Sequence, residues 1–310
     1  MANGTRHRGG LHLIPRPGGQ SLRYFLKEMC SSFMDDDITG RSAQLAFYFF
    51  FAIFPGFIFL SSLADIVSRG GDGVRAIVLR HLSTAVPPQA FGVLQDAFKR
   101  TGHHAGGLTF GVIVALWSAT FGMSAVCDTL NGVQDVKESR PWWKVQLTAF
   151  GLTIITTILV LCAIGALFAG DSVIQIAGSS FASGPLWVMV KVVQWAIVLV
   201  LLALIFGITY YLAPDVEDRQ WHWMTPGASI GIVLWVAASI GLRYYVNQFS
   251  SYSSTYGSIG AVMILLLWFY VAGFALLTGG EVNAVLEDIA AQKGDPGAIQ
   301  KGERAPGRAA

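Results

Sequence analysis

Charged and amide side chains inside long apolar runs are the residues of this chain best placed to do chemistry. They are Lys191 and Gln194 in one run, Arg243 in the next, and Glu281 and Asn283 near the end of the last. A charge inside a bilayer is costly, so such side chains are expected to face a bundle interior, reach the headgroups or contact a substrate. We treat all of them as candidate substrate-contacting residues.

Two cations belong to the half of the membrane that we expect to be outermost. Lys191 lies three residues before Gln194, so the two share one face of a helix. Arg243 precedes a pair of tyrosines, as is typical of a membrane interface. Three interpretations stay open: the cations extend to outer headgroups, they bind an anionic headgroup together, or each forms a local ion pair.

Glu281 and Pro55 are the other polar or irregular features of the runs. Glu281 lies near the inner end of the last run, and three interpretations of it stay open. It is an interfacial anchor, the partner of Arg41 near the start of the first run, or a proton-coupled or ligand-contacting group. Pro55 is near mid-span, where it frees a backbone carbonyl, predicts a kink and is our candidate hinge.

Catalytic motifs are not evident. None of the six histidines has a metal-ligand spacing, and there is no phosphate-binding glycine loop ending in Lys-Ser/Thr and no Gly-x-Ser-x-Gly elbow. No segment outside the runs is large enough for a basic, aromatic-lined groove for nucleic acid. The sequence therefore predicts no catalytic residue, no metal, no cofactor, no nucleic-acid partner and no enzyme.

Six apolar runs must position these residues. A bilayer core about 30 Å thick needs roughly 20 helical residues. The runs cover about 43–67, 108–127, 146–169, 186–212, 224–246 and 259–286. The composition agrees, because 53% of residues are hydrophobic and only 13% are charged. We predict an all-α, polytopic integral membrane protein with six transmembrane helices plus amphipathic interfacial helices, surrounded by membrane lipids; a homo-oligomer stays open.

The distribution of lysine and arginine predicts that both termini are cytoplasmic. The amino-terminal arm, the loop after the second run and the tail are basic, whereas the loops near 170–185 and 247–258 have no lysine or arginine. The basic loop 68–107 is the exception. We divide the chain into a cytosolic arm at 1–41 with an amphipathic helix, a membrane domain at 42–286 that includes the amphipathic outer loop 68–107, and a disordered tail at 287–310.

Several motifs resemble the YihY/virulence factor BrkB family, an inner-membrane family once labelled ribonuclease BN. They are residues 42–48 (Ser-Ala-Gln-Leu-Ala-Phe-Tyr) with Pro55, 256–261 (Tyr-Gly-Ser-Ile-Gly-Ala), 266–270 (Leu-Leu-Trp-Phe-Tyr), and 280–284 (Gly-Glu-Val-Asn-Ala). Trp142-Trp143-Lys144 and Ala213-Pro214-Asp215 are weaker similarities. The resemblance spans about residues 22–290, and the mild departure is Gly280, where many members have alanine.

Membership would imply a six-helix bundle in the bacterial inner membrane with cytoplasmic termini, but no settled activity. Some members are associated with virulence, and lipid or envelope-precursor export has been suggested within the family. Our first hypothesis is a non-ATP-driven transporter or flippase of an anionic amphipath or lipid. The alternative is a structural or partner-recruiting envelope protein without transport. Nothing in the residues supports the older ribonuclease label.

Overall fold

The computed structural model describes residues 22–67, 105–177, 185–217, 225–248, 252–294 and 298–303. Within these ranges all of the regular secondary structure is helical. The helices are α1 (Leu22–Asp35), α2 (Ile38–Val67), α5 (Ala105–Val133), α6 (Trp142–Ala177), α7 (Pro185–Leu212), α8 (Pro226–Gln248) and α9 (Tyr252–Gln292).

Each predicted apolar run overlaps a separate long helix in the described part of the chain, so the all-helical fold class is confirmed. In the described part of the chain, four stretches are long and apolar enough to cross a membrane: Trp142–Leu167, Trp187–Leu212, Pro226–Tyr245 and Val262–Gln292. Helices α2 and α5 do not join that set, so the count of six spans stays a prediction.

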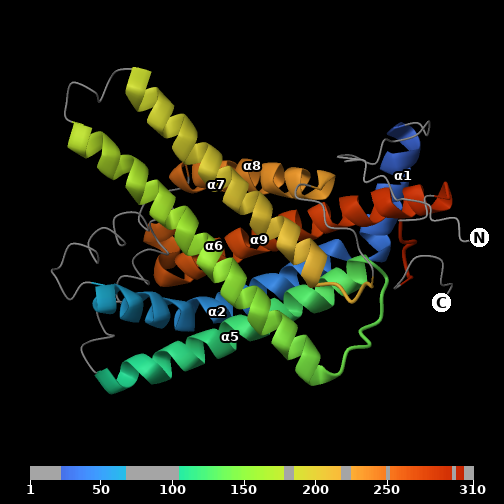
Figure 1. The fold of residues 1–310 in the computed structure, drawn as a ribbon, viewed down its shortest axis with the longest axis horizontal. Helices are drawn as coiled ribbons and strands as arrows, with labels where there is room; N and C mark the ends of the chain where they lie inside the picture. Colours follow the sequence, from blue (N-terminus) through green and yellow to red (C-terminus); the bar gives the residue numbers. More distant parts are fainter. Residues whose placement is uncertain are drawn as a thin grey trace, which may run out of the picture.

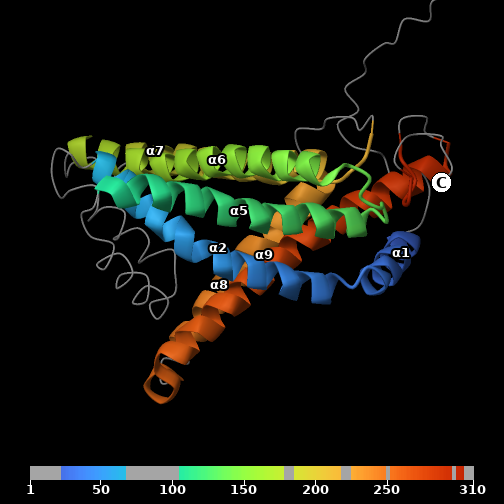
Figure 2. The same ribbon diagram turned by 90° about the horizontal axis from the view of Figure 1, so that it is seen from below.

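The helices form a bundle that is packed at one end and divided at the other. Helix α9 packs on α2 and α8, α2 packs on α5, and α6 packs on α7. Figure 1 shows α6 and α7 running side by side. In Figure 2 these two lie in one layer above α5 and α2. Helix α8 and the first half of α9 extend together away from these four helices. The packed end lies where α1, the start of α2 and the end of α9 meet.

Burial follows this arrangement. The fully buried apolar side chains Leu45, Leu130 and Leu277 come from α2, α5 and α9 and form a core at the packed end. Large apolar side chains of α6 and α7, such as Ile158 and Val192, are exposed instead. A surface of this kind suits contact with lipid tails, which are as apolar as the side chains themselves.

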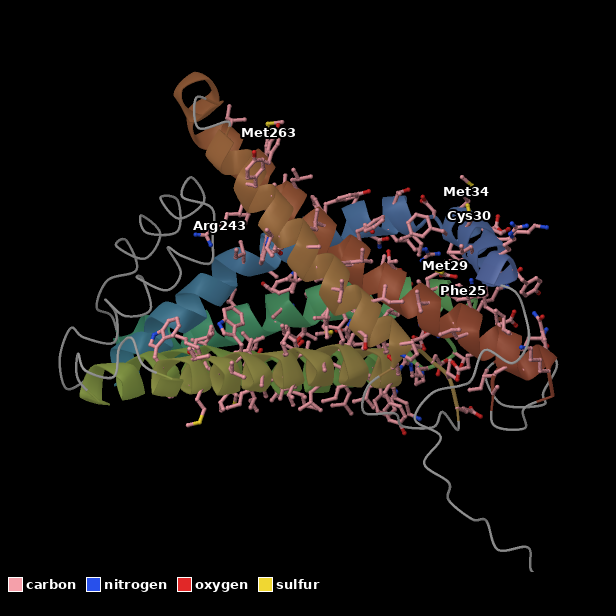
Figure 3. The ribbon with its side chains drawn as sticks, turned by 90° about the horizontal axis from the view of Figure 1, so that it is seen from above. Phe25, Met29, Cys30, Met34, Arg243 and Met263 are labelled. Atoms are coloured by element: carbon pink, nitrogen blue, oxygen red, sulfur yellow. The ribbon has the colours of Figure 1, made fainter. Side chains whose placement is uncertain are left out.

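The predicted amphipathic helix of the arm is present as α1. Its Phe33 packs edge-on against Phe274 of α9, with ring centroids 5.5 Å apart. In Figure 3, Cys30 and Met34 lie on the side of α1 turned away from the bundle, and Phe25 and Met29 lie nearer α9. Helix α1 therefore rests on α9 and presents a second apolar face, which includes Leu26 and Met34.

The tail differs from our expectation of disorder from residue 287 onward. Helix α9 continues to Gln292, and residues 298–303 fold back onto the bundle, where Ile299 is 4% exposed. The Gly, Ala and Pro content suggested disorder, but polar contacts described below order this segment.

Pro55 lies within α2, whose helix is continuous across it. Most of the predicted outer loop, residues 68–104, lies outside the described residues.

Candidate functional site: a buried ion cluster

Glycines allow α9 to approach its neighbours closely at the level of Glu281. A Cβ atom on Gly279 would lie 2.5 Å from the carbonyl oxygen of Gly227 on α8, and one on Gly280 would lie 2.9 Å from Leu130 Cδ2 on α5. Tyr210 of α7 adds a hydrogen bond from its hydroxyl to the carbonyl of Leu276, at 2.7 Å. This tight packing leaves the side chain of Glu281 with no exposed surface.

The partner of Glu281 is Lys301, a residue of the tail. Lys301 Nζ lies 2.9 Å from Glu281 Oε1 and 2.5 Å from Asp36 Oδ2, in the turn between α1 and α2. The Asp36 side chain is also buried. Burial alone would lower the pKa of Lys301, but the Glu281 and Asp36 carboxylates outweigh it and raise that pKa above its usual value. Lys301 is therefore held as an ammonium ion.

Two more charged groups complete what we call the ion cluster: Asp36, Arg41, Asp135, Glu281 and Lys301. Asp135, just after α5, has its carboxylate 3.9 Å from Lys301 Nζ. The pKa of Asp135 is raised overall, because partial burial and the neighbouring Asp36 raise it by more than Lys301 lowers it. The Nε of Arg41 donates to the backbone carbonyl of Asp36 at 2.7 Å. Three carboxylates therefore surround one ammonium, with one guanidinium beside them.

Backbone contacts hold the tail in place around Lys301. The amide of Lys301 donates to Asp288 Oδ1 at 3.2 Å, and the amide of Gly302 donates to the carbonyl of Gln134 at 2.9 Å. The tail thus joins α9 to the end of α5 as well as to the turn before α2. One Glu281 oxygen, Oε2, is buried without a hydrogen-bond partner.

Asn283 faces the start of α8 and not the ion cluster. Its Oδ1 accepts a hydrogen bond from the amide of Gly227 at 2.9 Å, and its Nδ2 donates to Thr225 Oγ1 at 2.9 Å. Thr225 Oγ1 also accepts from the amide of Ala228 at 3.1 Å. Amides in the first turn of a helix lack helical partners. Asn283 and Thr225 satisfy two of them, so Asn283 fixes α8 against α9.

Lys191 and Gln194 do share a face of α7, and their side chains meet. Lys191 Nζ donates to Gln194 Oε1 at 3.1 Å, and Gln194 Nε2 donates to the carbonyl of Leu167 on α6 at 2.6 Å. This contact is a hydrogen bond to a neutral amide and not an ion pair, so the three interpretations of Lys191 stay predictions. Arg243 is exposed near the end of α8. Figures 1 and 2 show that this end of α8 diverges from the start of α7, so the structure does not bring Arg243 to Lys191.

The loop between α5 and α6 holds a second polar network that the sequence reasoning missed. Arg140 binds both carboxylate oxygens of Glu138, at 2.8 and 2.7 Å, and donates to the carbonyl of Ala213 at 2.9 Å. Asp215 accepts from the amide and hydroxyl of Ser139 at 2.9 and 2.8 Å. Burial would raise the pKa of Glu138, but the hydrogen bonds and charge of Arg140 outweigh it and lower that pKa. The network ties two loops together.

The chemistry available at these sites is ion pairing and proton exchange. Among the described residues, no group of three or more His, Cys, Asp or Glu side chains is arranged to hold a metal ion. Glu281 is the only sequence candidate that the ion cluster contains; Asn283 lies next to it on α9 but has a structural partner. Lys191 and Gln194 lie elsewhere, on α7 against α6.

Long apolar helices with apolar side chains turned outward, joined by buried polar contacts at one end, define a multi-pass membrane protein. The sequence model of the virulence factor BrkB family matches residues 29–302, and the chain belongs to that family. The matched region includes all five residues of the ion cluster.

Relatives agree with this assignment. The chain is 32% identical over 265 residues to the ribonuclease-like protein YfkH of Bacillus subtilis, covering 84% of this chain and 94% of the relative. It is 27% identical over 251 residues to a UPF0761 membrane protein of Chromobacterium violaceum, covering 79% of this chain and 57% of that one. A UPF0761 membrane protein of Aliivibrio fischeri is 25% identical, with 87% and 84% covered. No solved structure matches the chain.

Proposed function

We propose that this protein is a non-ATP-driven transporter or flippase of an anionic amphipath or lipid in the bacterial inner membrane, with both termini cytoplasmic. The observation that carries the proposal is Glu281, a carboxylate with no exposed surface on a candidate membrane span, paired with a lysine from the tail. Ionisable residues within membrane spans are costly and usually functional.

A purely structural role explains this pair less well. Well-packed apolar residues often stabilise a buried site as much as an ion pair does, because both charges lose their hydration. An ion pair can, however, change state when one partner leaves or is neutralised. The sequence has no nucleotide-binding motif that would supply energy for transport. We therefore propose that breaking or neutralising the pair in the ion cluster accompanies the conformational change of the transporter.

Lys191 is our candidate contact for the anionic headgroup. It lies on α7 at the divided end of the bundle, held by Gln194, and it is partly buried. Gln194 orients it by bonding α6. For Arg243, which is exposed on α8, we propose a separate interfacial role, because α8 diverges from α7.

Lipid movement in proteoliposomes tests the proposal. Vesicles with and without the protein receive a trace of fluorescent phosphatidylglycerol, and a membrane-impermeant reductant reports the fraction in the outer leaflet over time. The protein should accelerate exchange, and Glu281→Gln should reduce the acceleration. Glu28→Gln on α1 makes the same chemical change on a different helix and should behave as wild type. Rates equal to those of empty vesicles for several anionic headgroups would refute transport.

A partner-recruiting role is the second candidate, and the second apolar face of α1 favours it, because Leu26 is 56% and Met34 is 78% exposed. Here Leu26→Ser with Met34→Ser should abolish function while Glu281→Gln and Lys191→Ala leave it intact. The ribonuclease-like name of YfkH is not carried over, since no catalytic motif of this sequence supports RNA cleavage.

A further inference from the structure

The ion cluster has an unusual source for its central cation. Asp36, Asp135 and Glu281 are carried by the helical bundle, whereas Lys301 is carried by a short segment that lies beyond the last helix. Between the end of α9 and the segment that contains Lys301, residues 295–297 lie outside the described part of the chain. Two of the carboxylates, those of Asp36 and Glu281, are therefore buried in the helical part of the protein, and their cation reaches them from the tail.

Charge balance limits how that tail can leave. With every group ionised, the cluster has three carboxylates against Lys301 and Arg41. Withdrawing Lys301 would leave Glu281 and Asp36 buried with no ammonium between them. Removing one partner of a buried pair is strongly unfavourable, because the other charge stays uncompensated. Departure of Lys301 is therefore costly unless another positive charge enters the site, since Arg41 alone would face three carboxylates.

The proton is the cation that fits this geometry. Glu281 is fully buried, and its Oε2 has no hydrogen-bond partner, so that oxygen can hold a proton without losing a contact. No group of the described His, Cys, Asp and Glu residues is arranged to hold a metal ion. We propose that the ion cluster is a proton-binding site, which Lys301 occupies in the closed state and vacates when a carboxylate takes up a proton.

The direction of the pH effect follows from linkage. Lys301 lowers the pKa of Asp135, as an ammonium does for any nearby carboxylate, so the open state without Lys301 binds protons more tightly than the closed state. Acidification therefore favours release of the tail. The charged groups that face the site are Asp36 in the turn before α2, Arg41 on α2, Asp135 after α5, and Glu281 and Asp288 on α9.

Acetylation of lysines in the full-length protein in nanodiscs tests the inference. A brief pulse of acetic anhydride followed by mass spectrometry gives the labelling rate of Lys301 relative to Lys144, which is exposed. The ratio cancels the general loss of amine reactivity at low pH. At neutral pH Lys301 should label at least about tenfold more slowly than Lys144, because labelling needs local opening. The ratio should rise as the medium is acidified, because the open state without Lys301 binds protons more tightly.

Two variants and a salt control sharpen the result. Glu281→Gln removes a charge, so Lys301 should label rapidly with little pH dependence; Asp135→Asn, at the exposed edge, should give the same change in smaller degree. A ratio that does not respond to pH would overturn the inference and leave a fixed ion pair. A ratio that responds to sodium chloride but not to equal choline chloride at constant pH would overturn the assignment to a proton. Lys301 labelling reports on the site whether or not the protein moves lipid.

Discussion

Lys301 Nζ lies 2.9 Å from Glu281 Oε1, so a residue of the tail neutralises a carboxylate that the last helix buries completely. Because Asp36 takes a second bond from the same ammonium, the pair also connects the two ends of the described chain. This relationship makes the stability of the bundle depend on a segment that has little apolar surface of its own.

Lys301→Met should therefore destabilise the protein by about 3 kcal/mol, since it leaves buried carboxylates without their cation. Thermal unfolding in detergent measures this as a lower Tm. Lys27→Met, on the exposed side of α1, is the matched control and should change Tm little. The double variant Lys301→Met with Glu281→Gln should recover part of the loss. Equal Tm values for Lys301→Met and wild type would contradict the buried pair.

Gly227→Ala should be severely destabilising. The new methyl group would overlap the Gly279 carbonyl and lie 2.5 Å from Asn283 Oδ1, both in the contact between α8 and α9. Overpacking of this kind typically costs about 1–3 kcal/mol. Gly241→Ala makes the same change on the same helix, where nothing lies within 4 Å of the added carbon. Retention of native Tm by Gly241→Ala but not Gly227→Ala, measured side by side, is the expected result.

Arg140→Met should make stability less dependent on acid pH. The pKa of Glu138 is lowered in the folded protein, so its contribution is present above the ordinary glutamate pKa and disappears as the pH falls through the lowered value. The variant should lose about 2 kcal/mol at neutral pH, as expected for charge-assisted hydrogen bonds. Tm values of the two proteins should converge between about pH 5 and pH 3. A constant difference over that range would contradict the role of Glu138.

Gln194→Leu should cost little stability, about 0.6 kcal/mol, which is typical of an interhelical hydrogen bond in a membrane protein. The change removes the bond to the Leu167 carbonyl and frees Lys191 from its local partner. In the lipid-exchange assay, activity should fall if Gln194 orients Lys191 for a headgroup. Full activity together with a lowered Tm would leave Gln194 a structural role alone.

The helices were predictable because each apolar run long enough to span a bilayer is also a helix in the structure. The partner of Glu281 was not. Arg41 was the nearest cation in the predicted topology, and it does lie at the ion cluster, but its Nε binds the Asp36 backbone instead. Lys301 lies in a Gly- and Pro-containing tail, a composition that predicts disorder. Only its tertiary contacts with Asp36, Glu281 and Asp288 reveal that this segment packs on the bundle.

Asn283 shows the same limit. Its position two residues after Glu281 suggested a shared chemical role, yet neighbours in sequence at that spacing point to different sides of a helix. Asn283 instead satisfies amides at the start of α8, a role that requires knowing which helix lies opposite. By contrast, the pairing of Lys191 with Gln194 was accessible from sequence, because it depends only on spacing within one helix.

The position of Lys301 also has a consequence for shortened chains. It follows all the described helices, so a chain that stops before residue 301 keeps every one of them but lacks the cation that binds Glu281. In such a chain the carboxyl group of Glu281 has to take up a proton or find another cation, because a buried charge without a partner is strongly unfavourable. Truncation at this point therefore removes no helix, yet it changes the ionisation of one.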